Sequence, residues 1–109
     1  MTAEEFIKLK EEKFQNSPEI TVKDIKRDRM HKWTREAWTF LQQSDYPGKV
    51  FTIERLRLDD KLEYRFGYYI VSEYGRTKGK WVWGQFSPFI PAKDLNKLLE
   101  KAKRDGTII

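Results

Sequence analysis

The sequence predicts an α+β fold: a three-stranded antiparallel β-meander with N-terminal helices and a C-terminal helix packed on the sheet. Apolar residues at helical spacing lie toward both ends of the chain, and residues 49–86 alternate between apolar and polar side chains as strands do. Segments that contain Gly and Pro separate these regions. The 109 residues suffice for a single domain, residues 1–109, which would bury roughly 65% of its unfolded surface.

The first helix is expected over residues 3–14, where four apolar side chains follow a helical stripe: Phe6, Ile7, Leu9 and Phe14. Thr2 and Glu5 have the spacing of a capping box, in which each side chain accepts a hydrogen bond from the other residue's backbone N–H. Pro18 disfavours helical geometry at Ser17, so this helix should end there.

A second helical region is predicted over residues 22–41, because six apolar residues fall within an arc of about 100° on a helical projection. They are Val22, Met30, Trp33, Ala37, Phe40 and Leu41. A bend near residues 31–34 would divide the region, with Thr34 as the N-cap of a second piece, residues 35–43. Residues 20–22 are either a short strand or the entry to this helix, and Pro47 and Gly48 end the region.

The sheet is predicted to contain residues 49–58 and the two arms of a hairpin over residues 62–86. In the first strand the apolar phase changes between Ile53 and Leu56, which predicts a β-bulge. Residues 59–61 supply the turn into the hairpin. The alternation along both arms of the hairpin places aromatic side chains on both faces of the sheet.

The final helix is predicted over residues 92–104, with Pro91 in its first turn and Gly106 as its C-terminal cap. Four residues should form its buried stripe: Leu95, Leu98, Leu99 and Ala102. Residues 107–109 are expected to pack on the domain or to add a short edge strand. The predicted core comprises Trp33, Phe40, Leu41, Phe51, Ile53, Phe66, Ile70, Val82, Phe86, Leu95, Leu98 and Leu99.

The residue content excludes several kinds of site. The chain has no cysteine and one histidine, which excludes disulfides and thiolate metal sites and leaves little nitrogen ligand for zinc. We therefore expect neither a metal nor a cofactor. No apolar run reaches the length of a membrane span, and the first residues lack the pattern of a signal peptide. The sequence thus predicts a cytoplasmic protein without a membrane partner.

The charge distribution gives the first indication of function. A formal net charge of +5 and a pI near 9.4 favour polyanionic partners. Residues 23–35 contain six cations and two acids, a local balance of 6 − 2 = +4. Further cations accompany the aromatic residues of the predicted sheet. Such surfaces bind single-stranded nucleic acid, because cations neutralise phosphates while aromatic rings stack on bases.

The leading hypothesis is a small, basic, non-enzymatic nucleic-acid-binding protein with DNA or RNA as its partner. The candidate binding residues are Lys23, Lys26, Arg27, Arg29, Lys32, Arg35, Arg55, Arg57, Arg65, Tyr69, Arg76, Lys78, Lys80, Trp81 and Trp83. The alternative is a protein-interaction or self-association module that uses an exposed aromatic face of the sheet and has no nucleic-acid role. Enzymatic activity is less favoured than either.

Several further patterns have simpler explanations. A basic segment, a helix and a hairpin follow one another in winged helix-turn-helix proteins, which would make residues 35–43 a recognition helix, but Trp38 and Phe40 leave it a narrow polar face. Residues 75–80 lack the spacing of a phosphate-binding loop and fit a hairpin loop better. The sequence around His31 does not match a Ser–His–Asp or Cys–His pattern, so a surface position is expected rather than a role as general base. Four carboxylates suggest a magnesium site for phosphodiester cleavage, although adjacent aspartates are common in turns: Glu54, Asp59, Asp60 and Glu63.

Overall fold

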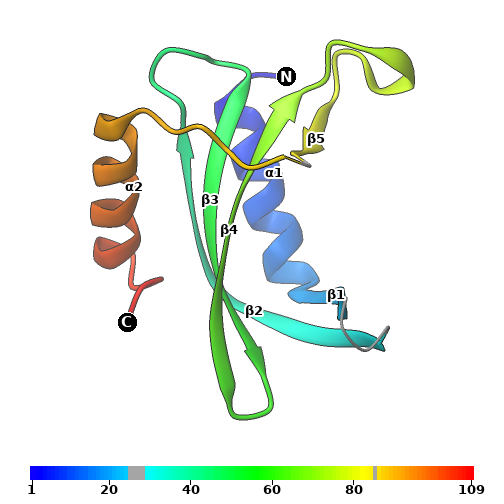
Figure 1. The fold of residues 1–109 in the computed structure, drawn as a ribbon, viewed down its shortest axis with the longest axis vertical. Coiled ribbons are helices and arrows are strands. Elements are labelled where there is room, and N and C mark those ends of the chain that lie inside the picture. The colour runs from blue at the N-terminus through cyan, green and yellow to red at the C-terminus, as the bar shows by residue number, and fades with distance from the viewer. Residues whose placement is uncertain (25–28, 85) are drawn as a thin grey trace.

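The computed structural model describes residues 1–24, 29–84 and 86–109, and of residues 23, 24 and 29 the backbone alone. The α+β class is confirmed, but the sheet is a curled antiparallel sheet of five described strands rather than three, in the order β1-β2-β3-β4-β5 (Figure 1). The elements are α1 (Ala3–Asn16), β1 (Glu19–Asp24), β2 (Arg29–Gln42), β3 (Lys49–Leu58), β4 (Lys61–Val71), the 3₁₀ turn η1 (Gly75–Thr77), β5 (Trp81–Trp83) and α2 (Ala92–Arg104).

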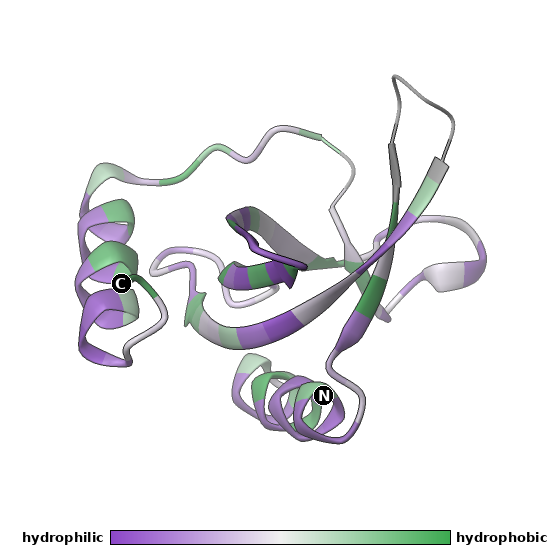
Figure 2. Ribbon diagram, turned by 90° about the horizontal axis from the view of Figure 1, so that it is seen from below, coloured by the Kyte–Doolittle hydropathy of each residue, from purple (hydrophilic) through white to green (hydrophobic). Residues whose placement is uncertain are grey.

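The two helices cover opposite faces of the sheet, as the two perpendicular views show (Figures 1 and 2). The first core cluster lies between α1 and the sheet and contains Ala3, Phe6, Phe14, Phe40, Val50 and Tyr69. The second lies between α2 and the other face and contains Phe51, Ile53, Tyr68, Leu98 and Ala102. Of the aromatic residues predicted on the two faces of the hairpin, Tyr69 is buried under α1 and Tyr68 under α2, whereas Tyr64, Phe66 and Phe86 are exposed.

Several local predictions are confirmed. Thr2 and Glu5 form the capping box, with hydrogen bonds of 3.1 and 3.2 Å between the side chain of each and the backbone N–H of the other. Helix α2 has the predicted bounds, and Gly106 follows it with φ of 79°. Strands β4 and β5 pair as a hairpin in the register Tyr69↔Trp83.

The predicted helix over residues 22–41 is wrong, because the described part of this region forms β1 and most of β2, which pair as a hairpin. A bulge between Arg35 and Ala37 shifts the register of β2 against β3. Beyond the bulge, Phe40 packs under α1 and Leu41 packs under α2. The bulge shifts the alternation of side chains by one residue, and beyond it both faces of the strand pack against helices, so the apolar spacings become three and four residues, as in a helix.

The bulge predicted for β3 is wrong, since β3 pairs with β4 in unbroken register from Lys49↔Ile70 to Leu58↔Lys61. The change of apolar phase in β3 arises because the strand is buried on both sides. Four members of the predicted core are also exposed: Phe66 (41%), Phe86 (82%), Leu95 (38%) and Leu99 (37%). Only Leu98 and Ala102 of the predicted stripe on α2 are buried.

Candidate functional site

Two of the predicted binding arginines are held inside the domain by a buried carboxylate. Glu54, on the central strand β3, is fully buried and lies under α1 between two guanidinium groups. Arg35 donates from Nε to its Oε1, and Arg65 donates from Nε to its Oε2 at 2.8 Å. The two arginines also lie over aromatic rings, Arg35 at 4.0 Å from the Phe14 centroid and Arg65 at 4.4 Å from that of Trp83. Arg35 and Arg65 are thus committed to the arginine–glutamate cluster Arg35–Glu54–Arg65.

Two of the predicted stacking residues belong to the same layer. Tyr69 is 5% exposed, and burial together with the Glu54 carboxylate raises its pKa to about 12. Trp83 packs edge-on against Tyr69, with ring centroids 5.0 Å apart. The Trp83 ring also lies directly over Gly67, where an added Cβ would come within 2.2 Å of it. Tyr69 is therefore a core residue, and the Trp83 ring packs against Tyr69, Gly67 and Arg65.

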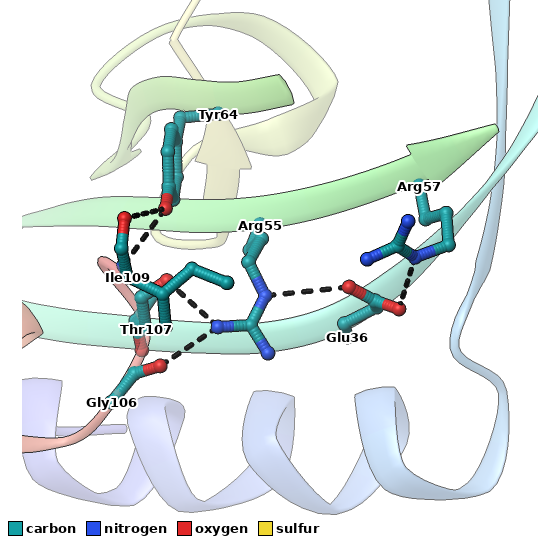
Figure 3. A network of polar contacts seen from close by, with 7 residues as sticks. All are labelled: Glu36, Arg55, Arg57, Tyr64, Gly106, Thr107 and Ile109. Carbon is teal, nitrogen blue, oxygen red and sulfur yellow. Dashed lines mark hydrogen bonds and ion pairs between the residues drawn. The ribbon is translucent and has the colours of Figure 1, made fainter. Parts of the chain in front are cut away.

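Arg55 and Arg57 converge on Glu36, the bulge residue of β2 (Figure 3). Arg57 donates from Nε to the Glu36 carboxylate at 2.6 Å, and this hydrogen bond lowers the pKa of Glu36. Arg55 lies 3.4 Å from the same carboxylate and donates to the Gly106 carbonyl at 2.8 Å. These two arginines therefore help to hold the segment after α2 against the sheet.

The end of the chain is fixed by further contacts on the same face. Thr107 is buried and its hydroxyl lies 2.8 Å from that of Thr39. The backbone N–H of Ile109 donates to the Tyr64 hydroxyl at 3.0 Å (Figure 3). Ile108 packs against the core cluster under α2. Residues 107–109 therefore pack on the domain, which is one of the two outcomes that the sequence suggests.

The structure describes only part of the basic segment, residues 23–35. Lys32 pairs with Glu19 across the β1–β2 hairpin at 3.3 Å. Lys26 and Arg27 lie outside the described residues. Lys23 and Arg29 are placed by their backbones at the described ends of β1 and β2.

The remaining predicted cations lie on the loop between β4 and β5, and all three are exposed: Arg76, Lys78 and Lys80. The loop is held together by Ser72, whose backbone N–H donates to the Lys80 carbonyl at 2.9 Å and whose carbonyl accepts from Gly79 at 2.8 Å. Gly79 has φ of 82°, in the region that favours glycine. This geometry carries Lys80 and Trp81 back toward α1.

A groove between α1 and this loop brings three lysines together. It has a volume of about 440 Å³. We call it the lysine groove; it is lined by Met1, Phe6, Leu9, Lys10, Lys13, Gly79, Lys80 and Trp81. None of these residues is acidic. Among the described residues, Lys10, Lys13 and Lys80 form no ion pair. Positive charge is thus concentrated in the lining of the groove, and the nearby buried carboxylate of Glu54 offsets it only in part.

The electrostatics of Lys10 reflect this concentration. Burial lowers the pKa of Lys10, and the positive charges of Lys13 and Arg35 lower it further. Its ammonium lies 4.9 Å from the ring centroid of Tyr69, a favourable but weak compensation. An anion in the groove would relieve the repulsion among these charges and favour the protonated form of Lys10.

Trp81 forms part of the groove and is fixed in place. Its ring stacks on Phe6, with centroids 4.7 Å apart and an interplanar angle of 12°. Its indole Nε1 donates to the Met1 carbonyl at 3.2 Å. The ring is half-buried and contributes to the groove lining. Trp81 is therefore the one predicted stacking residue that lies beside accessible cations.

Lys10 and Lys13 were not among the binding residues predicted from the sequence, although their spacing gives a signal. On a helix both lie next to Phe6 and Phe14, which are buried against the sheet. Lysines that border the buried stripe of a helix lie close to the neighbouring layer, where their ammonium groups can converge with those of another element. On α1 they meet the loop that carries Lys80.

A second, apolar groove lies between α2 and the sheet. It has a volume of about 310 Å³. We call it the α2 groove; it is lined by Ile53, Tyr64, Phe66, Leu95, Leu99 and Ile108. The exposed parts of Phe66 and Leu95 described above belong to it. Side chains of this kind on a protein surface favour contact with another protein.

The acidic residues do not form a metal site within the part of the chain that the structure describes. No group of three or more histidine and carboxylate side chains lies close enough there to hold an ion. Glu54 is engaged with two arginines, and Asp59 occupies the β3–β4 turn with φ of 54°. Of the carboxylates that suggested a magnesium site, Glu54 therefore pairs with arginines and Asp59 forms part of a turn.

Comparisons of the chain with protein-family models, with curated proteins and with solved structures found no match. Among the described residues, no helix is both long enough and apolar enough to cross a membrane. The assignment of function therefore depends on the geometry of the lysine groove and of the α2 groove.

Proposed function

We propose that the protein binds nucleic acid through the lysine groove. The observation that supports this function is the convergence of Lys10, Lys13 and Lys80 on one groove whose lining contains no carboxylate. Phosphate groups suit such a site, because neutralising them releases counterions from the nucleic acid and removes the repulsion among the lysines. Arg76 and Lys78, exposed on the adjoining loop, extend the positive surface beyond the groove.

This proposal differs from the sequence-based one in the residues it uses. Arg35, Arg65, Arg55 and Arg57 are left out because each is already paired with a carboxylate, that of Glu54 or Glu36. The contact set becomes Lys10, Lys13, Arg76, Lys78 and Lys80. If these five cations contact five phosphates, the logarithm of affinity should fall with the logarithm of salt concentration at a slope of roughly −3.5 to −4.5.

The test is fluorescence anisotropy with a labelled oligonucleotide over a range of salt concentrations. Replacing Lys13 and Lys80 together by Gln should weaken binding and reduce the steepness of the salt dependence by about two phosphate contacts. The matched control replaces Lys97 and Lys103, two exposed lysines of α2 on the opposite face of the sheet. An affinity that does not depend on salt, or an equal loss in both double variants, would contradict the proposal.

A second candidate function is protein interaction through the α2 groove. The exposure of Phe66, Leu95 and Leu99 around an apolar groove favours it. Light scattering at increasing protein concentration tests self-association, and Leu99→Gln should abolish any rise in mass. A constant monomer mass at all concentrations would leave oligomerisation without support.

A further inference from the structure

The position of Trp81 in the lysine groove indicates which form of nucleic acid the groove can bind. Trp81 lies at the edge of the sheet, on strand β5, and is held by Phe6 on one side and by its hydrogen bond to Met1. A ring fixed in this way loses little side-chain entropy when a base packs on it. Bases stack on aromatic rings without regard to sequence, because every base has a π-face.

Duplex DNA would not reach this ring. In a duplex each base is stacked between neighbours, so its face becomes available to a protein only when the base is unpaired or flipped out. The groove's volume of about 440 Å³ lies toward the low end of the range for small-ligand pockets, roughly 300–1,000 Å³. Such a volume suits a nucleotide rather than a double helix.

The recognition helix predicted from the sequence is also not formed. A recognition helix must be free to enter the major groove. The segment predicted for that role, residues 35–43, instead belongs mainly to β2, where residues 34–42 pair with β3. This segment is a strand and therefore cannot act as the recognition helix of a helix-turn-helix protein.

We infer, on the basis of the proposed nucleic-acid function, that the ligand is single-stranded and that one unpaired base packs on Trp81. Lys10, Lys13 and Lys80 neutralise the phosphates on either side of that base. Affinity then has two parts, an electrostatic part from the lysines and a stacking part from the ring. The stacking part does not depend on salt to first order, whereas the electrostatic part does.

The experiment separates the two parts by comparing three labelled probes of equal length at one salt concentration: oligo(dT), an abasic sugar-phosphate strand with the same charge, and a duplex. Stacking of one base predicts that oligo(dT) binds about 5- to 150-fold more tightly than the abasic strand. It also predicts weaker binding of the duplex than of oligo(dT). Equal affinity for oligo(dT) and the abasic strand, or tighter binding of the duplex, would overturn the inference while leaving the lysine groove as a polyanion site.

Variants of Trp81 test whether this residue provides the stacking part of the affinity. Trp81→Leu should reduce the preference for oligo(dT) over the abasic strand to less than about twofold, with an unchanged salt slope. Trp81→Phe keeps an aromatic ring against Phe6 and should retain part of the preference, so it serves if the leucine variant does not fold. Trp33→Phe, on strand β2, is the matched control and should keep the full preference. A preference that survives Trp81→Leu would also overturn the inference, and failure of all three probes to bind wild-type protein would refute the proposed function itself.

Discussion

The arginine–glutamate cluster should respond strongly to loss of its central charge, and Glu54→Gln is the sharpest perturbation. The substitution keeps the shape of the side chain but replaces one acceptor oxygen by an NH₂ group. Arg35 and Arg65 approach the two carboxylate oxygens separately, so the new NH₂ group must face an arginine donor. One guanidinium then loses its partner in an environment where Glu54 is fully buried and Arg35 is 11% exposed.

The expected cost follows from these contacts. A hydrogen bond to a charged group contributes roughly 1.5–3 kcal/mol, and Glu54 accepts such bonds from two arginines. Removing one partner of a buried ion pair typically costs about 3–5 kcal/mol, because the other charge remains buried. We therefore expect Glu54→Gln to lower the free energy of unfolding by about 4 kcal/mol. With a denaturant dependence of about 2 kcal/mol/M, the urea midpoint would fall by about 2 M.

The assay is urea unfolding followed by tryptophan fluorescence, with Glu36→Gln as the control. Glu36 also lies between two arginines, Arg55 and Arg57, but its side chain is 27% exposed and that of Arg57 is 41% exposed. Water can replace the lost contacts there, so Glu36→Gln should change the midpoint little. The reasoning is refuted if Glu54→Gln costs less than about 1 kcal/mol, or if both variants lose the same stability.

Three other substitutions test neighbouring features. Gly67→Ala places a Cβ within 2.2 Å of the Trp83 ring and should destabilise the fold by about 1–3 kcal/mol, a cost that should vanish in a Trp83→Leu background when unfolding is measured for all four proteins. The raised pKa of Tyr69, about 12 against an ordinary 10.0, means that the unfolded chain releases this proton first as the pH rises. Stability should therefore fall by about 2 kcal/mol between about pH 10 and pH 12 relative to Tyr69→Phe, as measured by urea unfolding; equal pH dependence of the two proteins would contradict this. Because the pKa of Lys10 is below 10.5, oligonucleotide affinity should begin to fall at lower pH in wild-type protein than in Lys10→Arg, and identical anisotropy profiles would exclude a contact from Lys10.

Local sequence signals predicted the elements at both ends of the chain. The capping box at Thr2 and Glu5 and the Pro18 break define α1, while Pro91 and Gly106 frame α2. These signals act through backbone geometry and hydrogen bonds within a few residues, so the rest of the fold does not alter them.

The strand β2 could not be predicted in this way, because its pattern is set by the layers around it. Trp38 and Phe40 face α1, whereas Leu41 faces α2, and the bulge before Ala37 shifts the alternation by one residue. A period-2 pattern identifies a strand when one face meets water. In β2, residues 30–36 alternate between exposed and partly buried side chains, but the bulge and the two helices that cover the strand beyond it break this alternation, so the strand as a whole has no single apolar face to detect.

The candidate site was predictable only in part for a related reason. Lys80 and Trp81 were identified from the hairpin, but Lys10 and Lys13 join them through the packing of α1 on the sheet, which no local pattern reveals. The sequence also gives no indication of which arginines are already neutralised. Glu54 and Arg65 face each other only because β3 and β4 pair in that register.

Net charge is therefore a poor guide to where this protein would hold a polyanion. Glu54 and Glu36 together engage four arginines on β2, β3 and β4, so the central sheet contributes cations that are already balanced in part. The cations of α1 and of the β4–β5 loop have no such partners among the described residues, and they meet at one edge of the sheet. Coulomb attraction between exposed charges is screened within about 10 Å at moderate salt, so a bound phosphate responds to the charges beside it rather than to the total. Affinity should therefore depend on Lys10, Lys13 and Lys80 far more than on the larger number of lysines and arginines elsewhere in the chain.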